Sequence, residues 1–191
     1  MVKRSSAWRV LQRIDPHLVH ITSPAAYASM RVSGVIEPND GTRPFTFPQS
    51  RDSFASRRRA VALFDFFSPP THVVAEQSIK WLGFFSCHRP VTLALVISRS
   101  GLPSQLINYK QALAAAGLGP MKIPHVELWH PGSIPLSAIL RVIALRRDPF
   151  RYRSFQPAAP ILLAADLLRR LWPNLPAPRD GCELVFDPSG R

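Results

Sequence analysis

The sequence predicts one domain that combines helices and strands in the α+β class. Its 191 residues are close to the usual size of a single compact domain. Hydrophobic residues make up 46% of the chain, which is enough for a packed core despite 20 prolines. Short apolar segments rich in β-branched residues alternate with segments whose apolar residues recur at helical spacing, and this alternation favours a mixed structure.

The first elements form a strand followed by a helix. A short helix is expected over residues 5–14, ahead of the β-rich strand 18–22. Ser23 and the proline after it are typical of an N-cap and a first helical position, so a second helix should start there. Gly34 is the residue expected to end it.

The remaining elements are predicted from periodicity and from breakers. A short strand is a candidate at 45–47, inside an irregular connection rich in Arg and Ser. Residues 135–145 fit either a helical turn that leads into a strand or one helix. The clearer patterns predict a strand at 60–67, a helix at 71–85, a strand at 91–98, a helix at 103–116 and a strand at 123–129.

The chain divides by composition near residue 150. Residues 1–150 hold the predicted domain, and residues 151–191 form a proline-rich, basic C-terminal extension with one apolar helix candidate at 161–172. We expect this extension to be partly ordered, packed weakly or only with a partner.

Basic residues outnumber acidic ones two to one and predict a polyanionic partner. The chain has 24 Lys and Arg against 12 Asp and Glu, a formal net charge of +12, and 20 of the cations are arginine. Arginine binds phosphate or carboxylate through paired hydrogen bonds. Nucleic acid fits this balance, and basic stretches at 50–59 and 146–153 carry aromatic residues suited to base stacking. A generic basic surface would have the same composition.

Three features favour the cytoplasm and argue against a membrane. The two cysteines, Cys87 and Cys182, form one disulfide at most, as expected in a reducing compartment. Arg9 and Arg13 interrupt the stretch that would be the apolar core of a signal peptide. The longest apolar run, 91–97, is far shorter than the roughly 20 residues of a membrane span.

Glu127 is the acidic residue whose surroundings call for an explanation. The chain has four glutamates, and Glu127 alone lies inside an apolar, strand-like run. Period-two alternation places His125 and Trp129 on its face of the strand. A buried carboxylate costs free energy unless it is paired or solvated, so Glu127 indicates either the wall of a cleft or a structural ion pair with an arginine.

His20 is a second candidate, near the end of the first predicted strand and just before a helix cap. A histidine there can form a hydrogen bond with a ligand hydroxyl. The alternative is a buried histidine whose hydrogen bonds are satisfied within the fold. No metal site is expected, because the adjacent Cys87 and His88 lack ligand spacing and His125 and His130 fall on opposite strand faces.

Several motifs in order carry a family resemblance. LVHITS at 18–23, a short helix and SGVI at 33–36 resemble the opening of NAD-dependent ADP-ribosyltransferase folds. RRAVALFDFFSP at 58–69 is similar to the strand that follows an essential arginine in the DarT-like toxins of that group. IPHVEL at 123–128, followed by PGSIP at 131–135, resembles the final strand with the catalytic glutamate.

The resemblance covers roughly residues 17–145 and implies a split antiparallel sheet with NAD+ in the cleft between its halves. On this basis His20 would contact a ribose hydroxyl and Thr22 would flank the nicotinamide amide. Glu127 would bind the 2′-hydroxyl of the nicotinamide ribose and face the charge that develops as nicotinamide leaves. Arg58 or Arg59 would be the catalytic arginine, reaching a diphosphate or the acceptor.

The remaining family positions have several candidates here. The residue that stacks near nicotinamide would be Tyr27, Ser50 or Phe47. The position two before the glutamate, which helps to select the acceptor in the family, is His125. Trp129 on the same predicted face and Arg51 are further acceptor-binding candidates, and Arg51 and Arg57 also compete for the arginine role.

The sequence as a whole therefore predicts a cytoplasmic transferase that passes ADP-ribose from NAD+ to an acceptor, with nucleic acid favoured over protein. The resemblance also implies a toxin or defence factor, whose partner would be an antitoxin or immunity protein. The alternatives are a basic nucleic-acid-binding or assembly protein that uses the same scaffold without catalysis, and an RNA 2′-phosphotransferase that uses the same NAD+ cleft.

Overall fold

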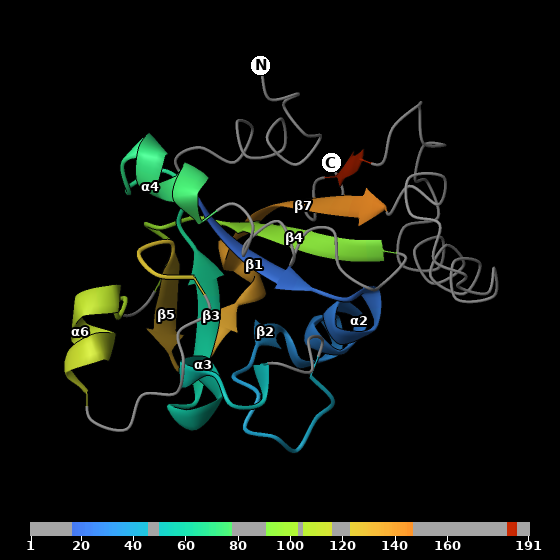
Figure 1. Ribbon diagram of the computed structural model, residues 1–191. Helices are drawn as coiled ribbons and strands as arrows, with labels where there is room; N and C mark the ends of the chain where they lie inside the picture. Colours follow the sequence, from blue (N-terminus) through green and yellow to red (C-terminus); the bar gives the residue numbers. More distant parts are fainter. Residues whose placement is uncertain are drawn as a thin grey trace, which may run out of the picture.

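The computed structural model is built around one antiparallel sheet and describes residues 17–45, 50–77, 91–102, 105–115, 123–146 and 183–186. Six strands lie in the order β5-β3-β1-β4-β7-β8, and every neighbouring pair is antiparallel (Figure 1). Their bounds are β1 Leu18–Thr22, β3 Ala60–Phe64, β4 Val91–Ile97, β5 Glu127–Pro131, β7 Ile139–Arg146 and β8 Glu183–Phe186. This confirms the predicted mixture of helices with an antiparallel sheet.

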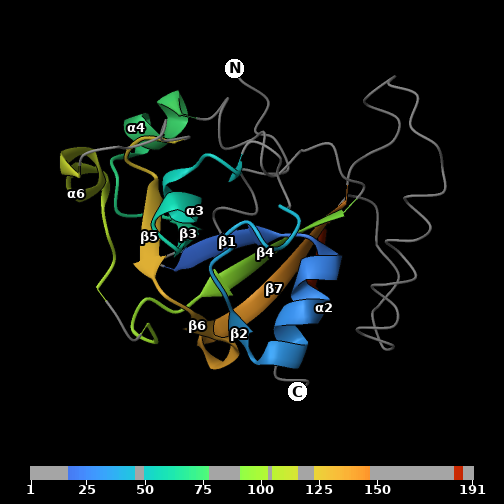
Figure 2. The ribbon, with the colours of Figure 1, turned by 90° about the horizontal axis from the view of Figure 1, so that it is seen from below.

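Short helices and a two-stranded sheet complete the described part of the chain. The helix α2 packs against β2 and β4, and α3 packs against β3 (Figure 2). These elements are α2 Pro24–Ser33, β2 Val35–Ile36, α3 Phe54–Arg57, α4 Thr71–Glu76, α6 Tyr109–Ala114, β6 Ile134–Pro135 and the 3-10 turn η2 Leu136–Ala138. Among the described residues, no helix has both the length and the apolar character needed to cross a membrane.

The sheet is continuous on both sides of one opening. β1 pairs with β4 along its whole length, and β3 pairs with β5 from Ala60 opposite Pro131 to Phe64 opposite Glu127. β1 and β3 share a single pair, Val19 opposite Phe64. The two halves of the sheet are therefore joined at one row and separate beyond it.

The core lies on both faces of the sheet. Alternate residues of β3 point to opposite faces. Val61 and Leu63 belong to the larger cluster, which includes the buried faces of β1 and β4, whereas Ala60 packs with Trp129 and Phe54 in a smaller cluster under α3. Both clusters hold the strands in place beside the opening.

The predicted start and end of α2 are confirmed by its caps. The Ser23 hydroxyl accepts a hydrogen bond from the Ala26 N–H at 3.2 Å, and Pro24 occupies the first turn. Gly34 adopts the left-handed conformation with φ 76° and donates its N–H to the Met30 carbonyl at 2.8 Å. The caps fix the direction in which the chain leaves β1.

Two predicted strands are shorter than expected. The strand predicted at 60–67 ends at Phe64, because the Asp65 carboxylate accepts the N–H groups of Phe67 and Ser68 and folds them into a turn. The strand predicted at 123–129 starts only at Glu127, because 123–126 form a turn. The strand predicted at 91–98 is confirmed as β4.

Residues 135–145 take the first of their two predicted alternatives, since η2 leads directly into β7. The helix predicted at 103–116 is present as α6, which is shorter and has a capping box formed by Asn108 and Gln111. The helix predicted at 71–85 is described only up to residue 77, where α4 has ended.

Some predictions fall outside the described residues. These are the helices at 5–14 and 161–172 and most of the strand candidate at 45–47. Within the extension predicted at 151–191, the described segment is β8, which pairs with β7 at the edge of the sheet.

Candidate functional site

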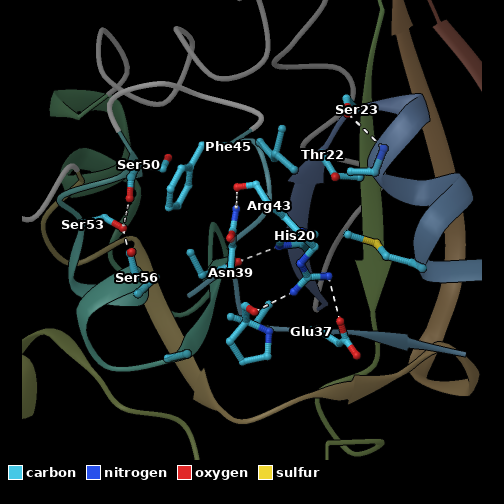
Figure 3. A pocket seen from close by; sticks show the side chains of 18 of the residues that line it. His20, Thr22, Ser23, Glu37, Asn39, Arg43, Phe45, Ser50, Ser53 and Ser56 are labelled. Carbon is cyan, nitrogen blue, oxygen red and sulfur yellow. Dashed lines mark hydrogen bonds and ion pairs between the residues drawn. The ribbon is translucent and has the colours of Figure 1, made fainter. Parts of the chain in front are cut away.

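A cavity of about 430 Å³ lies where β1 and β3 separate (Figure 3). Its volume is in the range of small-molecule sites. The wall is formed by the end of β1, the start of α2, the loop 37–45, the segment 50–56, β3 and the first residue of β5. The polar side chains that line it belong to His20, Thr22, Ser23, Ser29, Glu37, Asn39, Arg43, Ser50, Ser53, Ser56 and Glu127.

Glu127 enters the cavity from the start of β5. The residue is 5% exposed, and its Oε2 accepts the Ile123 N–H at 3.3 Å. In return the Glu127 N–H donates to the Ile123 carbonyl at 3.0 Å. The turn before β5 thus holds the carboxylate in place.

His20 extends from β1 toward β3 at the opening. Its Nδ1 lies 2.9 Å from the Ala62 carbonyl. Burial lowers the pKa of His20 below its ordinary value, and the hydrogen bond to Ala62 offsets only part of that effect. The ring is therefore neutral near pH 7. Because a carbonyl only accepts, Nδ1 carries the proton and Nε2 remains as a hydrogen-bond acceptor.

Thr22 and Ser50, two of the residues predicted to bind the cofactor, also line the cavity. Thr22 is 2% exposed at the end of β1. Ser50 precedes α3, and its carbonyl accepts the Ser53 hydroxyl at 2.7 Å. The Ser53 hydroxyl also accepts the Ser56 N–H at 3.3 Å and thereby caps α3.

The loop 37–45 contributes residues that sequence reasoning missed. Arg43 donates from Nη1 to the Glu37 carboxylate and from Nη2 to the Pro38 carbonyl, both at 2.8 Å (Figure 3). The Asn39 Nδ2 donates to the Arg43 carbonyl at 3.0 Å, and the Asn39 Oδ1 accepts the Gly41 N–H. The sequence signal was the Asn-Asp-Gly run at 39–41, which favours a tight turn that returns the chain to the site.

Besides the predicted arginines, three predicted site residues do not line the cavity. Tyr27, expected beside nicotinamide, is buried in the larger core cluster. Trp129, expected at the acceptor, is buried with its ring centroid 4.6 Å from that of Phe54. His125 is exposed in the turn before β5, with φ 65° and its ring against Tyr109 at 4.5 Å. It does not share a strand face with Glu127, because that strand has not yet begun.

The predicted arginines lie near the cavity without lining it. Arg51 and the run 57–59 are exposed around α3, beside Ser50 and Ser56, which do line it. Hydrogen bonds from Thr42 lower the pKa of Asp40, with a smaller contribution from the charge of Arg59. Arg59 therefore lies near Asp40 in the loop 37–45.

The described residues contain no group of three or more His, Cys, Asp or Glu side chains that could hold a metal ion. Cys87, His88 and Cys182 lie outside the described residues.

The arrangement pairs a fixed carboxylate with a neutral imidazole acceptor in one cavity. Such a site can bind vicinal hydroxyls and stabilise positive charge. Comparison with known proteins supplies no family for it: no protein-family model matches the chain, and no curated protein matches it significantly.

Proposed function

We propose that this protein transfers ADP-ribose from NAD+ to an acceptor, and that its core is the split antiparallel sheet of the ADP-ribosyltransferases. The observation that carries the proposal is that His20 and Glu127, which lie far apart in the sequence, line one cavity where β1 and β3 separate. A dinucleotide in that opening would have the imidazole on one side and the carboxylate on the other.

Glu127 would stabilise the transition state. When the bond between the ribose C1′ and the nicotinamide nitrogen breaks, its electron pair leaves with nicotinamide and the ribose becomes an oxocarbenium-like cation. A fixed anion binds this cation more strongly than it binds neutral ribose. At ~4 Å and an effective dielectric constant of ~20, the interaction is worth about 4 kcal/mol. That corresponds to roughly a thousandfold in rate.

The other lining residues would orient NAD+. The His20 Nε2 would accept a ribose hydroxyl, and Thr22, next to the start of α2, would flank the nicotinamide amide. Ser50 would lie along the nicotinamide side of the cavity. The acceptor then attacks C1′ with a lone pair and releases a proton to solvent, which completes the transfer.

Nucleic acid is the proposed acceptor. The net charge of +12 favours a polyanion, and the exposed arginines around α3 lie beside the residues that line the cavity. A toxin or defence role, with an antitoxin or immunity protein as partner, belongs to the same proposal.

The test is NAD+ consumption by the purified protein, followed as nicotinamide release with and without single-stranded DNA or RNA. The variant E127Q keeps the shape of the side chain, removes its charge and should lower the rate at least about 100-fold. E76Q, an exposed position on α4, is the matched control and should keep the wild-type rate.

Two results would contradict the proposal. One is a folded wild-type protein that neither binds nor consumes NAD+ but binds nucleic acid in a salt-sensitive manner, which would favour the non-catalytic scaffold. The other is an E127Q variant as active as the wild type.

A further inference from the structure

The cavity offers little positive charge to the diphosphate of a dinucleotide. Among the described lining residues, Arg43 is the only arginine or lysine, while Glu37 and Glu127 are acidic. His20 is neutral near pH 7, for the reason given above. The diphosphate of NAD+ carries two negative charges, and an anion removed from water needs a cationic or hydrogen-bonding partner.

The Arg43 guanidinium retains donors for such a partner. Arginine has five N–H donors, and the bonds to Glu37 and to the Pro38 carbonyl engage two of its nitrogens. Arg43 lines the cavity and its side chain is 42% exposed, so its other N–H groups remain accessible to a ligand. The planar fork of a guanidinium suits two oxygens of a phosphate group.

The present partner of Arg43 is one that a diphosphate can displace. The Glu37 side chain is 44% exposed, and ion pairs this accessible to water contribute little to stability. Asn39 holds the backbone of Arg43 through the turn at 39–41, independently of Glu37. Loss of the Glu37 contact would therefore leave Arg43 at the cavity.

We propose that Arg43 binds the diphosphate of NAD+, and that Glu37 competes for the same guanidinium and is displaced when the dinucleotide enters. This inference rests on the proposed function, since it assumes that the cavity holds NAD+.

The two partners of one ion pair should then have opposite effects. We would measure Kd for NAD+, for ADP-ribose and for nicotinamide riboside, which lacks the diphosphate, by titration calorimetry. R43Q should weaken NAD+ and ADP-ribose about tenfold or more and leave nicotinamide riboside within about twofold. E37Q should tighten both diphosphate ligands. K110Q, which removes one positive charge from an exposed position on α6, is the control for net charge and should change none of the three affinities.

The outcomes separate the two proposals. Suppose that the wild-type protein binds NAD+ but that R43Q and E37Q weaken the binding of all three ligands alike. The ion pair then only shapes the loop: the proposed diphosphate contact is wrong, and the proposed function stands. An R43Q variant with wild-type affinities has the same meaning. If the wild type binds none of the diphosphate ligands, both proposals are overturned.

Discussion

His20 supplies a hydrogen bond at the point where the backbone ladder between β1 and β3 stops. Ile21 and Thr22 have no partner in β3, and the imidazole instead bonds the Ala62 carbonyl. A carbonyl that the ladder would leave without a partner is thus satisfied by a side chain. One residue therefore stabilises the opening of the sheet and presents a neutral acceptor to the cavity.

The lowered pKa of His20 predicts how stability changes with pH. Unfolded His20 binds a proton near its ordinary pKa of 6.5, whereas the folded protein resists protonation. Below that pH the unfolded state therefore binds more protons, and the free energy of unfolding falls as the pH falls. The slope from this group is at most about 1.4 kcal/mol per pH unit. Urea unfolding between about pH 5 and pH 7 measures it.

The variant H20Q should lose this part of the slope, while H72Q, at an exposed histidine of α4, should keep it. Equal slopes in wild type and H20Q would show that the ring at position 20 is not buried in its neutral form.

At lower pH a second loss of stability is expected from Asp65. Burial opposes its ionisation, but bonds from Ser68 and Phe67 and the charge of Arg99 outweigh burial and lower its pKa.

Single residues differed in how far the sequence could place them. Glu127 could be placed at a cavity because a lone carboxylate in an apolar run needs a physical reason. Tyr27 and Trp129 could not, because an aromatic side chain is as common in a core as in a binding site. Arg43 was missed because its place at the cavity depends on the turn at 39–41, which returns the chain to the site.

At the scale of elements, local signals predicted the boundaries best where a side chain or a left-handed residue makes the cap. Ser23 and Gly34 bound α2 as expected. The strand predicted at 123–129 was expected to start too early. Ile123 and Val126 are both buried, and a buried turn gives the same apolar pattern as a strand. Which strands become neighbours is a long-range matter, and the opening between β1 and β3 has no local signature.

The variant G34A tests the C-cap of α2. Gly34 has φ 76°, and a Cβ there would meet no atom within 4 Å, so the cost is backbone strain alone. We expect a loss of about 1 kcal/mol in the free energy of unfolding, measured by urea denaturation.

The matched substitution is G101A. Gly101 does not lie in the left-handed region, and its added Cβ would sit 3.4 Å from the nearest atom, the Ser98 Cβ. Its stability should change by no more than about 0.5 kcal/mol. A G34A variant as stable as G101A would argue that α2 does not end in the left-handed cap.

At the scale of the whole molecule, the strand order places the cavity between two well-paired halves. One half, formed by β3 and β5, contains Glu127, and the other half, formed by β1 and β4, contains His20. The two halves meet at the pair of Val19 and Phe64. Side chains from both halves of the sheet therefore line one cavity. The positive net charge of the chain is not a property of the cavity. Among the described residues that line it, Arg43 is the only arginine or lysine.

If nucleic acid is the acceptor, as proposed, this separation predicts where it binds. If the acceptor approaches the cavity along α3, the triple variant R57Q/R58Q/R59Q should weaken binding of single-stranded DNA or RNA. Each lost phosphate contact lowers the dependence of log K on log salt by about 0.7, so three contacts would lower it by about 2. Fluorescence anisotropy over a range of salt concentrations measures this slope. NAD+ hydrolysis without acceptor separates docking from the catalytic role that the resemblance implies for Arg58 or Arg59. The rate should stay near that of the wild type if these residues, which do not line the cavity, only dock the acceptor.

A variant with the same net charge decides between a docking surface and general attraction. R31Q/K110Q/R141Q also removes three cations, from α2, α6 and β7, and these residues do not line the cavity either. Docking along α3 requires that this control keep most of the wild-type salt slope and affinity. If both triple variants lose the same affinity, the charge of +12 attracts nucleic acid without regard to position, and α3 has no special place in acceptor binding.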